Sequence, residues 1–239
     1  MQAHAGKPVF ELVEEAVQVL RKTPLASLAC YYIGSVPFVL GILFFMADMS
    51  RSPFAQQRCA AAAMGLTLLY AWMRHWHTVF CSALHQQVAE LPESSWSASA
   101  AVRNAAAQFT HTAFSFILVP LSLVALFPYA WVYAYHQNLV AVRQHQRTSR
   151  KEVSRAARAY AADWARQNHL LISLLGLFRI VVWLNIVIIM VMLPGLLKSV
   201  IGLESRFAQS YWWIANTTFL TATLGITYLC VDPLVKAVY

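Results

Sequence analysis

Residues 24–47 read PLASLACYYIGSVPFVLGILFFMA, a continuous stretch without a charged side chain. A helix over this stretch is long enough to cross the roughly 30 Å hydrocarbon core of a bilayer. The preceding segment, residues 8–22, differs, because its apolar residues recur at helical spacing and its acidic residues precede its basic ones. That order suits the helix dipole, but the segment is too polar to span. We therefore predict an amphipathic helix in the membrane interface, followed by a membrane-spanning helix.

The composition of the whole chain also indicates a membrane protein. Of its 239 residues, 59% are hydrophobic and 12% are charged, whereas typical soluble domains are about 25% charged. The formal net charge is +8. Cationic residues of membrane proteins gather on the cytoplasmic side, so we predict anionic lipid of the cytoplasmic leaflet as a partner. The chain lacks a basic patch interleaved with aromatic residues, and we expect no nucleic-acid partner.

The pattern of an amphipathic helix followed by an apolar hairpin recurs along the chain. We predict a single all-α integral membrane domain, residues 1–239, with about six transmembrane helices and three interfacial amphipathic helices. The predicted amphipathic helices cover residues 8–22, 93–108 and 149–168, the last of them cytoplasmic. The predicted spans cover residues 24–47, 59–84, 109–142, 170–197 and 211–231.

Two of these spans have alternative interpretations. Residues 109–142 form either one span or a hairpin of two short spans that turns near Pro128. The span from Cys59 either runs to Leu84 or ends at Met73. In the second case Arg74 snorkels into the interface, which costs less than a buried arginine, and an interfacial helix follows.

The distribution of lysine and arginine predicts the orientation. With an even number of spans both termini lie on one side, and the outer loops then hold few cations: Arg51, Arg58, Lys198 and Arg206. The inner segments hold most of the others, including a basic run at Arg143, Arg147, Arg150, Lys151, Arg155, Arg158 and Arg166. The positive-inside rule therefore predicts cytoplasmic N- and C-termini in a bacterial inner membrane.

Small residues on single helix faces predict close helix contacts. Gly34 and Gly41 lie seven residues apart and so share a face of the first span. Thr217, Thr221 and Gly225 follow at intervals of four in the last span. We interpret the second set as a packing face, and the alternative is a polar transport path.

Arg179 is the clearest charge within a predicted span. An intramembrane ion is a candidate functional residue by default. Trp183, one turn further on, is a candidate cation–π partner, and Asn185 lies deeper in the same span. We interpret Arg179 as a structural or lipid anchor, with a transport role as the alternative.

The histidines suggest two kinds of site. His77, Cys81 and His85 are spaced to share a helical face and are candidate zinc or copper ligands. A fourth ligand and an acidic second shell are missing, so we predict no metal and interpret the face as the polar side of an interfacial helix. Axial ligands for a haem or a chlorophyll-type tetrapyrrole are a further possibility, at His75, His77, His111 and His136. We favour no cofactor.

The sequence contains no catalytic constellation. No Asp or Glu lies in a predicted span, and the chain has no P-loop, HExxH or GxSxG motif. We therefore predict a non-enzymatic multipass scaffold or accessory subunit of a larger bacterial membrane complex, with other membrane subunits as partners. The alternatives are a small-solute or lipid transporter and a haem- or pigment-binding electron- or energy-transfer subunit.

Three short segments resemble a known group of proteins. They are FELVEE at residues 10–15, YYIGSVPFVLG at residues 31–41 and TYLCVDPLVKAVY at residues 227–239. They are similar to segments of uncharacterised bacterial multipass membrane proteins whose membrane region precedes a transglutaminase-associated C-terminal domain. The resemblance implies that a cytoplasmic domain follows Tyr239, and it implies no catalytic residues.

Overall fold

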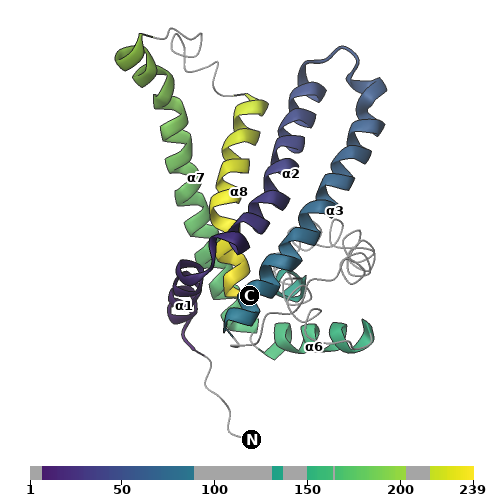
Figure 1. Ribbon diagram of the computed structural model, residues 1–239, viewed down its shortest axis with the longest axis vertical. Helices are drawn as coiled ribbons and strands as arrows, with labels where there is room; N and C mark the ends of the chain where they lie inside the picture. Colours follow the sequence, from purple (N-terminus) through teal and green to yellow (C-terminus); the bar gives the residue numbers. More distant parts are fainter. Residues whose placement is uncertain (1–6, 89–130, 137–149, 164, 203–215) are drawn as a thin grey trace, which may run out of the picture. The chain divides into compact units, whose positions relative to one another are not determined.

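The computed structural model describes residues 7–88, 131–136, 150–163, 165–202 and 216–239, and every regular element in these ranges is helical. Figure 1 shows the long helices and a short helix at residues 131–136. The long ones are α1 (Val9–Lys22), α2 (Leu25–Arg51), α3 (Ala55–Val88), α6 (Arg150–Asp163), α7 (Ala165–Ile201) and α8 (Thr217–Val238). The predicted all-α class is confirmed for these residues.

Three of these helices are long and apolar enough to cross a membrane, namely Leu25–Arg51, Gln167–Ile201 and Thr217–Val238. The helix α3 is longer than a typical span but is not among them. Its C-terminal half carries Arg74, His75 and His77, which lower its mean hydropathy. The predicted helix 93–108 and most of the predicted span 109–142 lie outside the described residues.

The helix boundaries follow the sequence signals at the N-terminal ends. Pro8 occupies the N-cap of α1, and α2 begins directly after Pro24. The helix α3 continues without a break through Arg74, so no separate interfacial helix begins there. The predicted helix 149–168 is divided, because α6 ends at Asp163 and α7 begins at Ala165.

The described helices contribute to two compact units. The first unit comprises Met1–Gly34, Ala71–Leu175 and Pro233–Tyr239, and the second comprises Ser35–Tyr70 and Gly176–Asp232. In the first unit, Tyr31 of α2 packs with Phe80 and Leu84 of α3 in a buried core. Apolar residues from three helices surround this core, namely Val19, Leu20, Leu28 and Ala237.

The apolar side of α6 is covered by protein. Val153 and Ala157 are buried and pack against Tyr135 of the short helix, whose hydroxyl lies 3.0 Å from the Ser154 hydroxyl. The arginines Arg155 and Arg158 are exposed. In α6, therefore, the apolar side is used for contact within the chain and the exposed side is basic.

Glycines allow the helices to approach closely, as predicted for Gly34 and Gly41. A Cβ at Gly34 would lie 2.6 Å from the Trp76 Cβ, and one at Gly41 would lie 2.6 Å from the Leu69 Cδ1. Both glycines therefore face α3. In the second unit, a Cβ at Gly225 of α8 would lie 2.6 Å from the Val39 Cγ1 of α2.

A proline in α2 is compensated by a side chain of α3. Pro37 lies inside α2 and has no N–H, so the carbonyl of Ile33 loses its usual donor one turn later. The indole Nε1 of Trp72 donates a hydrogen bond to this carbonyl at 3.0 Å. In an apolar environment such a carbonyl must find another donor, and a neighbouring helix provides it here.

Candidate functional site

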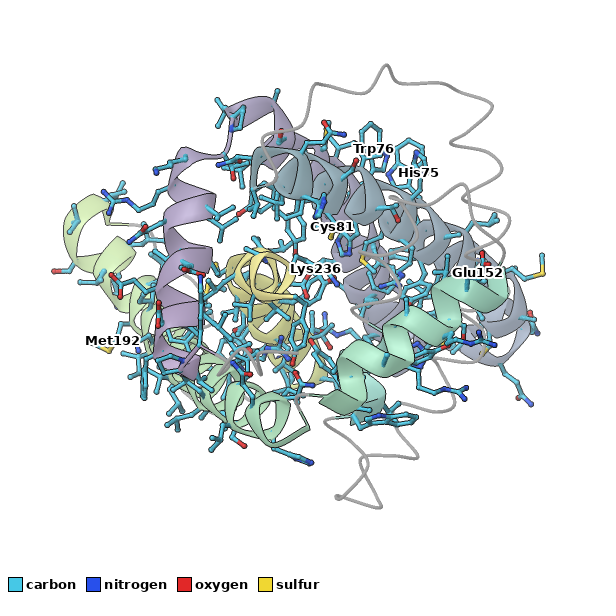
Figure 2. The ribbon with its side chains drawn as sticks, turned by 90° about the horizontal axis from the view of Figure 1, so that it is seen from below. His75, Trp76, Cys81, Glu152, Met192 and Lys236 are labelled. Atoms are coloured by element: carbon cyan, nitrogen blue, oxygen red, sulfur yellow. The ribbon has the colours of Figure 1, made fainter. Side chains whose placement is uncertain are left out.

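The first unit contains a pocket of about 200 Å³ between the ends of three helices. The helix α3 contributes Cys81, His85 and Val88, α8 contributes Lys236, and α1 contributes Val19. Figure 2 labels Cys81 and Lys236, which come from different helices and line this same pocket. The polar groups of the lining are accompanied by several apolar side chains, so the pocket suits a ligand with both polar and apolar parts.

Local sequence explains how the wall from α3 is built. Cys81, Leu84, His85 and Val88 recur at intervals of three and four, so they share one face of the helix. The pocket therefore uses part of the face on which His85 and Cys81 were predicted to lie together.

Hydrogen bonds fix the end of α1 beside this wall. The Gln87 Nε2 donates to the Val19 carbonyl at 3.1 Å, and the Thr23 hydroxyl donates to the same carbonyl at 2.8 Å. The Thr23 hydroxyl also lies 3.2 Å from the Gln87 Oε1. These bonds satisfy a carbonyl that the last turn of α1 leaves without a helical donor. At the other end, the Lys7 ammonium donates to the Glu15 carboxylate, which raises the pKa of Lys7 above its ordinary value.

The most buried cation of the pocket is Lys236, whose side chain is only 7% exposed. The sequence analysis did not identify Lys236 as a site residue. It also ended the last span at Val231, whereas α8 continues to Val238. Asp232 therefore lies near the C-terminal end of a helix that is long and apolar enough to span. The sequence did hold one sign that the helix continues past Val231: Asp232 and Lys236 are four residues apart, so they would share one face of a helix.

The three candidate metal ligands of α3 have different environments. His77 is 1% exposed and its ring stacks on Tyr31, with centroids 4.9 Å apart and planes 6° apart. Cys81 is half-buried and His85 is exposed. Within the described ranges no three His, Cys, Asp or Glu side chains form a group that could hold a metal ion. His77 is thus a core residue rather than part of an exposed polar face.

The candidate tetrapyrrole ligands that the structure describes each lie beside an aromatic ring. His75 lies edge-on to Trp76, and His136 lies edge-on to Tyr135. His77 belongs to the stack on Tyr31. His111 lies outside the described residues. Each described candidate histidine therefore contacts an aromatic ring.

The residues of the predicted transport path bond mostly to their own helices. The Asn185 Nδ2 donates to the Val181 carbonyl at 2.8 Å, and the Thr221 hydroxyl donates to the Thr217 carbonyl at 2.7 Å. The Nε of Arg179 is buried and has no hydrogen-bond partner among the residues that the structure describes.

The contact between α7 and α8 uses the hydroxyl of Thr223 rather than those of Thr217 and Thr221. The Trp183 Nε1 donates to the Thr223 Oγ1 at 3.2 Å, so the indole N–H is used in a contact with α8. Thr223 and Thr227 are buried, whereas Thr217 is exposed. Gly225 lies against α2, as a packing role for this residue requires.

Comparison with known proteins gives no match. No family model matches the chain, and neither a curated protein nor a solved structure matches it. The functional conclusions therefore depend on the residues and contacts described above.

Proposed function

We propose that this chain is a non-enzymatic multipass scaffold or accessory subunit of a larger bacterial membrane complex. The observation that supports this most directly is the exposure of α7. In the segment Gln167–Ile201, none of the most apolar window is buried inside the protein. This surface is available to lipid and to other membrane subunits.

The exposed side chains of α7 extend over more than half of its circumference at 3.6 residues per turn. They include Ile180, Val181, Leu184, Ile188, Ile189, Met192 and Leu193. Met192 is labelled in Figure 2. An apolar surface of this extent is typical of a membrane-embedded or subunit-contacting surface.

The exposed Asn185 favours a protein partner over lipid alone. It lies between Leu184 and Ile188 on the exposed surface of α7. Its Nδ2 bonds to its own helix, but an amide offers further donor and acceptor positions. Polar residues in apolar helices commonly form hydrogen bonds across helix interfaces.

The proposed topology has about six spans and both termini in the cytoplasm, in a bacterial inner membrane. The amphipathic α1 supports an interfacial position, because its acidic residues come early, Arg21 and Lys22 end it, and Phe10 is 75% exposed. As part of this proposal, the chain is similar to bacterial multipass membrane proteins whose membrane region precedes a transglutaminase-associated domain.

Site-specific photo-crosslinking tests the proposed role. A photoreactive amino acid at Leu184 or Ile188 should give the same discrete protein adduct in native membranes, because both side chains are exposed on α7. The buried Thr223 is the control position and should give no intermolecular adduct. Adducts with lipid alone at both α7 positions, together with a monodisperse monomer in mild detergent, would contradict the scaffold.

A further inference from the structure

We propose that the exposed side of α7 docks against the same helix of a second copy of this chain, as two parallel helices around a two-fold axis. The proposed dimer rests on the scaffold role, because it names one partner for the α7 surface described above. Three features of that surface support it: the spacing of its residues, the chemistry of Asn185 and the small residues near its end.

The exposed residues of α7 include a row with the spacing of a coiled coil. Intervals of four and three residues alternate along it, which is the heptad pattern of helices that pair with a left-handed crossing. The row extends over about 27 Å of helix, close to the thickness of the hydrocarbon core of a bilayer. We call it the α7 seam, and its six members are all exposed: Val181, Asn185, Ile188, Met192, Gly195 and Ser199.

The α7 seam differs from the rest of the exposed surface of this helix. Within residues 180–197, the exposed polar residue Asn185 and the exposed small residue Gly195 both belong to the seam. The exposed residues beside the seam in the same segment are all large and apolar, as suits lipid: Ile180, Leu184, Ile189, Leu193 and Leu196. The seam is therefore the part of this surface that suits a protein helix.

The amide of Asn185 favours a second copy of this chain over a different partner. Its Nδ2 donates to the Val181 carbonyl, which leaves one N–H and the side-chain carbonyl oxygen for a partner. Another asparagine offers the same two groups. Two copies inserted with the same topology hold Asn185 at the same depth, so a two-fold axis along the membrane normal brings the amides together. In soluble coiled coils a single asparagine in the seam fixes register and oligomeric state.

Small residues allow the two backbones to approach. A Cβ at Gly195 would have nothing within 4 Å, and the exposed Ser199 follows one turn later. Small residues at an interval of four are typical of close helix contacts in membranes. Residues 180–197 also contain no charged side chain, so two copies meet here without repulsion although each carries a net charge of +8.

Disulfide cross-linking of the full chain in native membranes tests the dimer. The background replaces the native cysteines by alanine: Cys30, Cys59, Cys81 and Cys230. Ile188→Cys should form a disulfide-linked dimer, because this seam residue meets its own copy across the axis. Ile189→Cys is the matched control, since the two isoleucines are adjacent and are 60% and 61% exposed. Ile189 lies about 100° further around the helix, and cysteines whose Cα atoms are more than about 7 Å apart do not bridge, so it should give little dimer.

Two substitutions at exposed positions test the contacts of the seam. Asn185→Leu should raise the dissociation constant of the dimer in mild detergent about 3- to 30-fold, because it removes the hydrogen bonds between the helices. Asn185→Gln keeps an amide and should lie closer to the wild type. Gly195→Leu should also weaken the dimer without unfolding the protein, because the new side chain enters open space in the single chain. Ile189→Ala, outside the seam, should leave the dissociation constant unchanged.

The outcomes separate the dimer from the scaffold role. Equal cross-linking of Ile188→Cys and Ile189→Cys, or an unchanged dissociation constant in both Asn185→Leu and Gly195→Leu, would overturn the dimer. No disulfide dimer from Ile188→Cys, together with a photo-crosslinked adduct to a different protein at Ile188, would also overturn it and would leave the scaffold role standing. If Ile188 formed neither the disulfide dimer nor any protein adduct, both proposals would be wrong.

Discussion

The two units bury different kinds of side chain. The first unit buries large residues, with Tyr31, Phe80 and His77 fully enclosed. The second unit buries small polar residues such as Ser35 and Thr223 beside Val231, while many of its large apolar side chains are exposed. In the first unit, the hydrophobic effect is sufficient to explain the core. In the second, exclusion from water cannot explain the arrangement, and close packing with interhelical hydrogen bonds holds the helices together, as is typical in lipid.

The largest expected effect comes from placing the same charge on each unit. Ile188→Lys in the second unit should sharply reduce membrane integration, because a lysine at a helix centre costs about 2.5–3.5 kcal/mol. Val17→Lys in α1 should integrate normally, because this partly exposed residue lies on an amphipathic helix. Alkaline carbonate extraction measures both. If both variants integrated equally well, the proposed difference in environment between Ile188 of α7 and Val17 of α1 would be wrong.

The next effect concerns close packing at Gly34. Gly34→Ala should destabilise the protein by about 1–3 kcal/mol, because the new methyl group would meet the Trp76 Cβ and the Met73 carbonyl. Gly41→Ala in the second unit should cost less, because the Leu69 Cδ1 that it meets is the end of a flexible side chain. Gly176→Ala is the matched control, since nothing lies within 4 Å. Unfolding in detergent measures all three, and an unstable Gly176→Ala would contradict this ranking.

A smaller effect tests the hydrogen bond that compensates Pro37. Trp72→Phe removes the donor to the Ile33 carbonyl and should cost about 0.6–1.7 kcal/mol. In a Pro37→Ala background the same change should cost less, because the restored N–H can bond to that carbonyl. Free energies of unfolding for the wild type, the two single variants and the double variant give this coupling. Additive effects would show that the Trp72 bond is not linked to the proline.

The smallest effect distinguishes two hydroxyls of α8. Thr223→Val should cost about 0.6 kcal/mol, because it removes the acceptor of the Trp183 indole. Thr221→Val should be close to neutral, since that hydroxyl donates to the Thr217 carbonyl of its own helix. Thermal unfolding of both variants in the same detergent measures the difference. A larger loss of stability in Thr221→Val than in Thr223→Val would favour the packing face predicted from the sequence, which contains Thr217, Thr221 and Gly225.

The sequence predicts the helical class well because apolar runs and prolines are local signals. Pro8 and Pro24 mark the starts of α1 and α2, and the spacing of Gly34 and Gly41 identifies the face toward α3. The extension of α8 past Asp232 was missed, because a charged residue next to Pro233 resembles the end of a span.

The site was harder to predict because it depends on which side of each helix meets a neighbour. Thr221 and Thr223 are two residues apart and so lie on nearly opposite sides of α8. Periodicity alone does not decide which of them bonds to Trp183. Likewise, His77 and His85 share a face of α3 by spacing, yet one is enclosed by Tyr31 and the other is exposed. Lys236 becomes a pocket residue only where the ends of α1 and α3 meet it.

The hydrogen bond from Trp72 to the Ile33 carbonyl has a consequence for the biogenesis of the protein. The chain is synthesised from its N-terminus, so Ile33 and Pro37 enter the membrane before Trp72 exists. Until α3 arrives, the Ile33 carbonyl has no donor in the surrounding hydrocarbon. The helix α2 therefore reaches its final hydrogen-bonded state only after α3 has been made, so the two helices mature together.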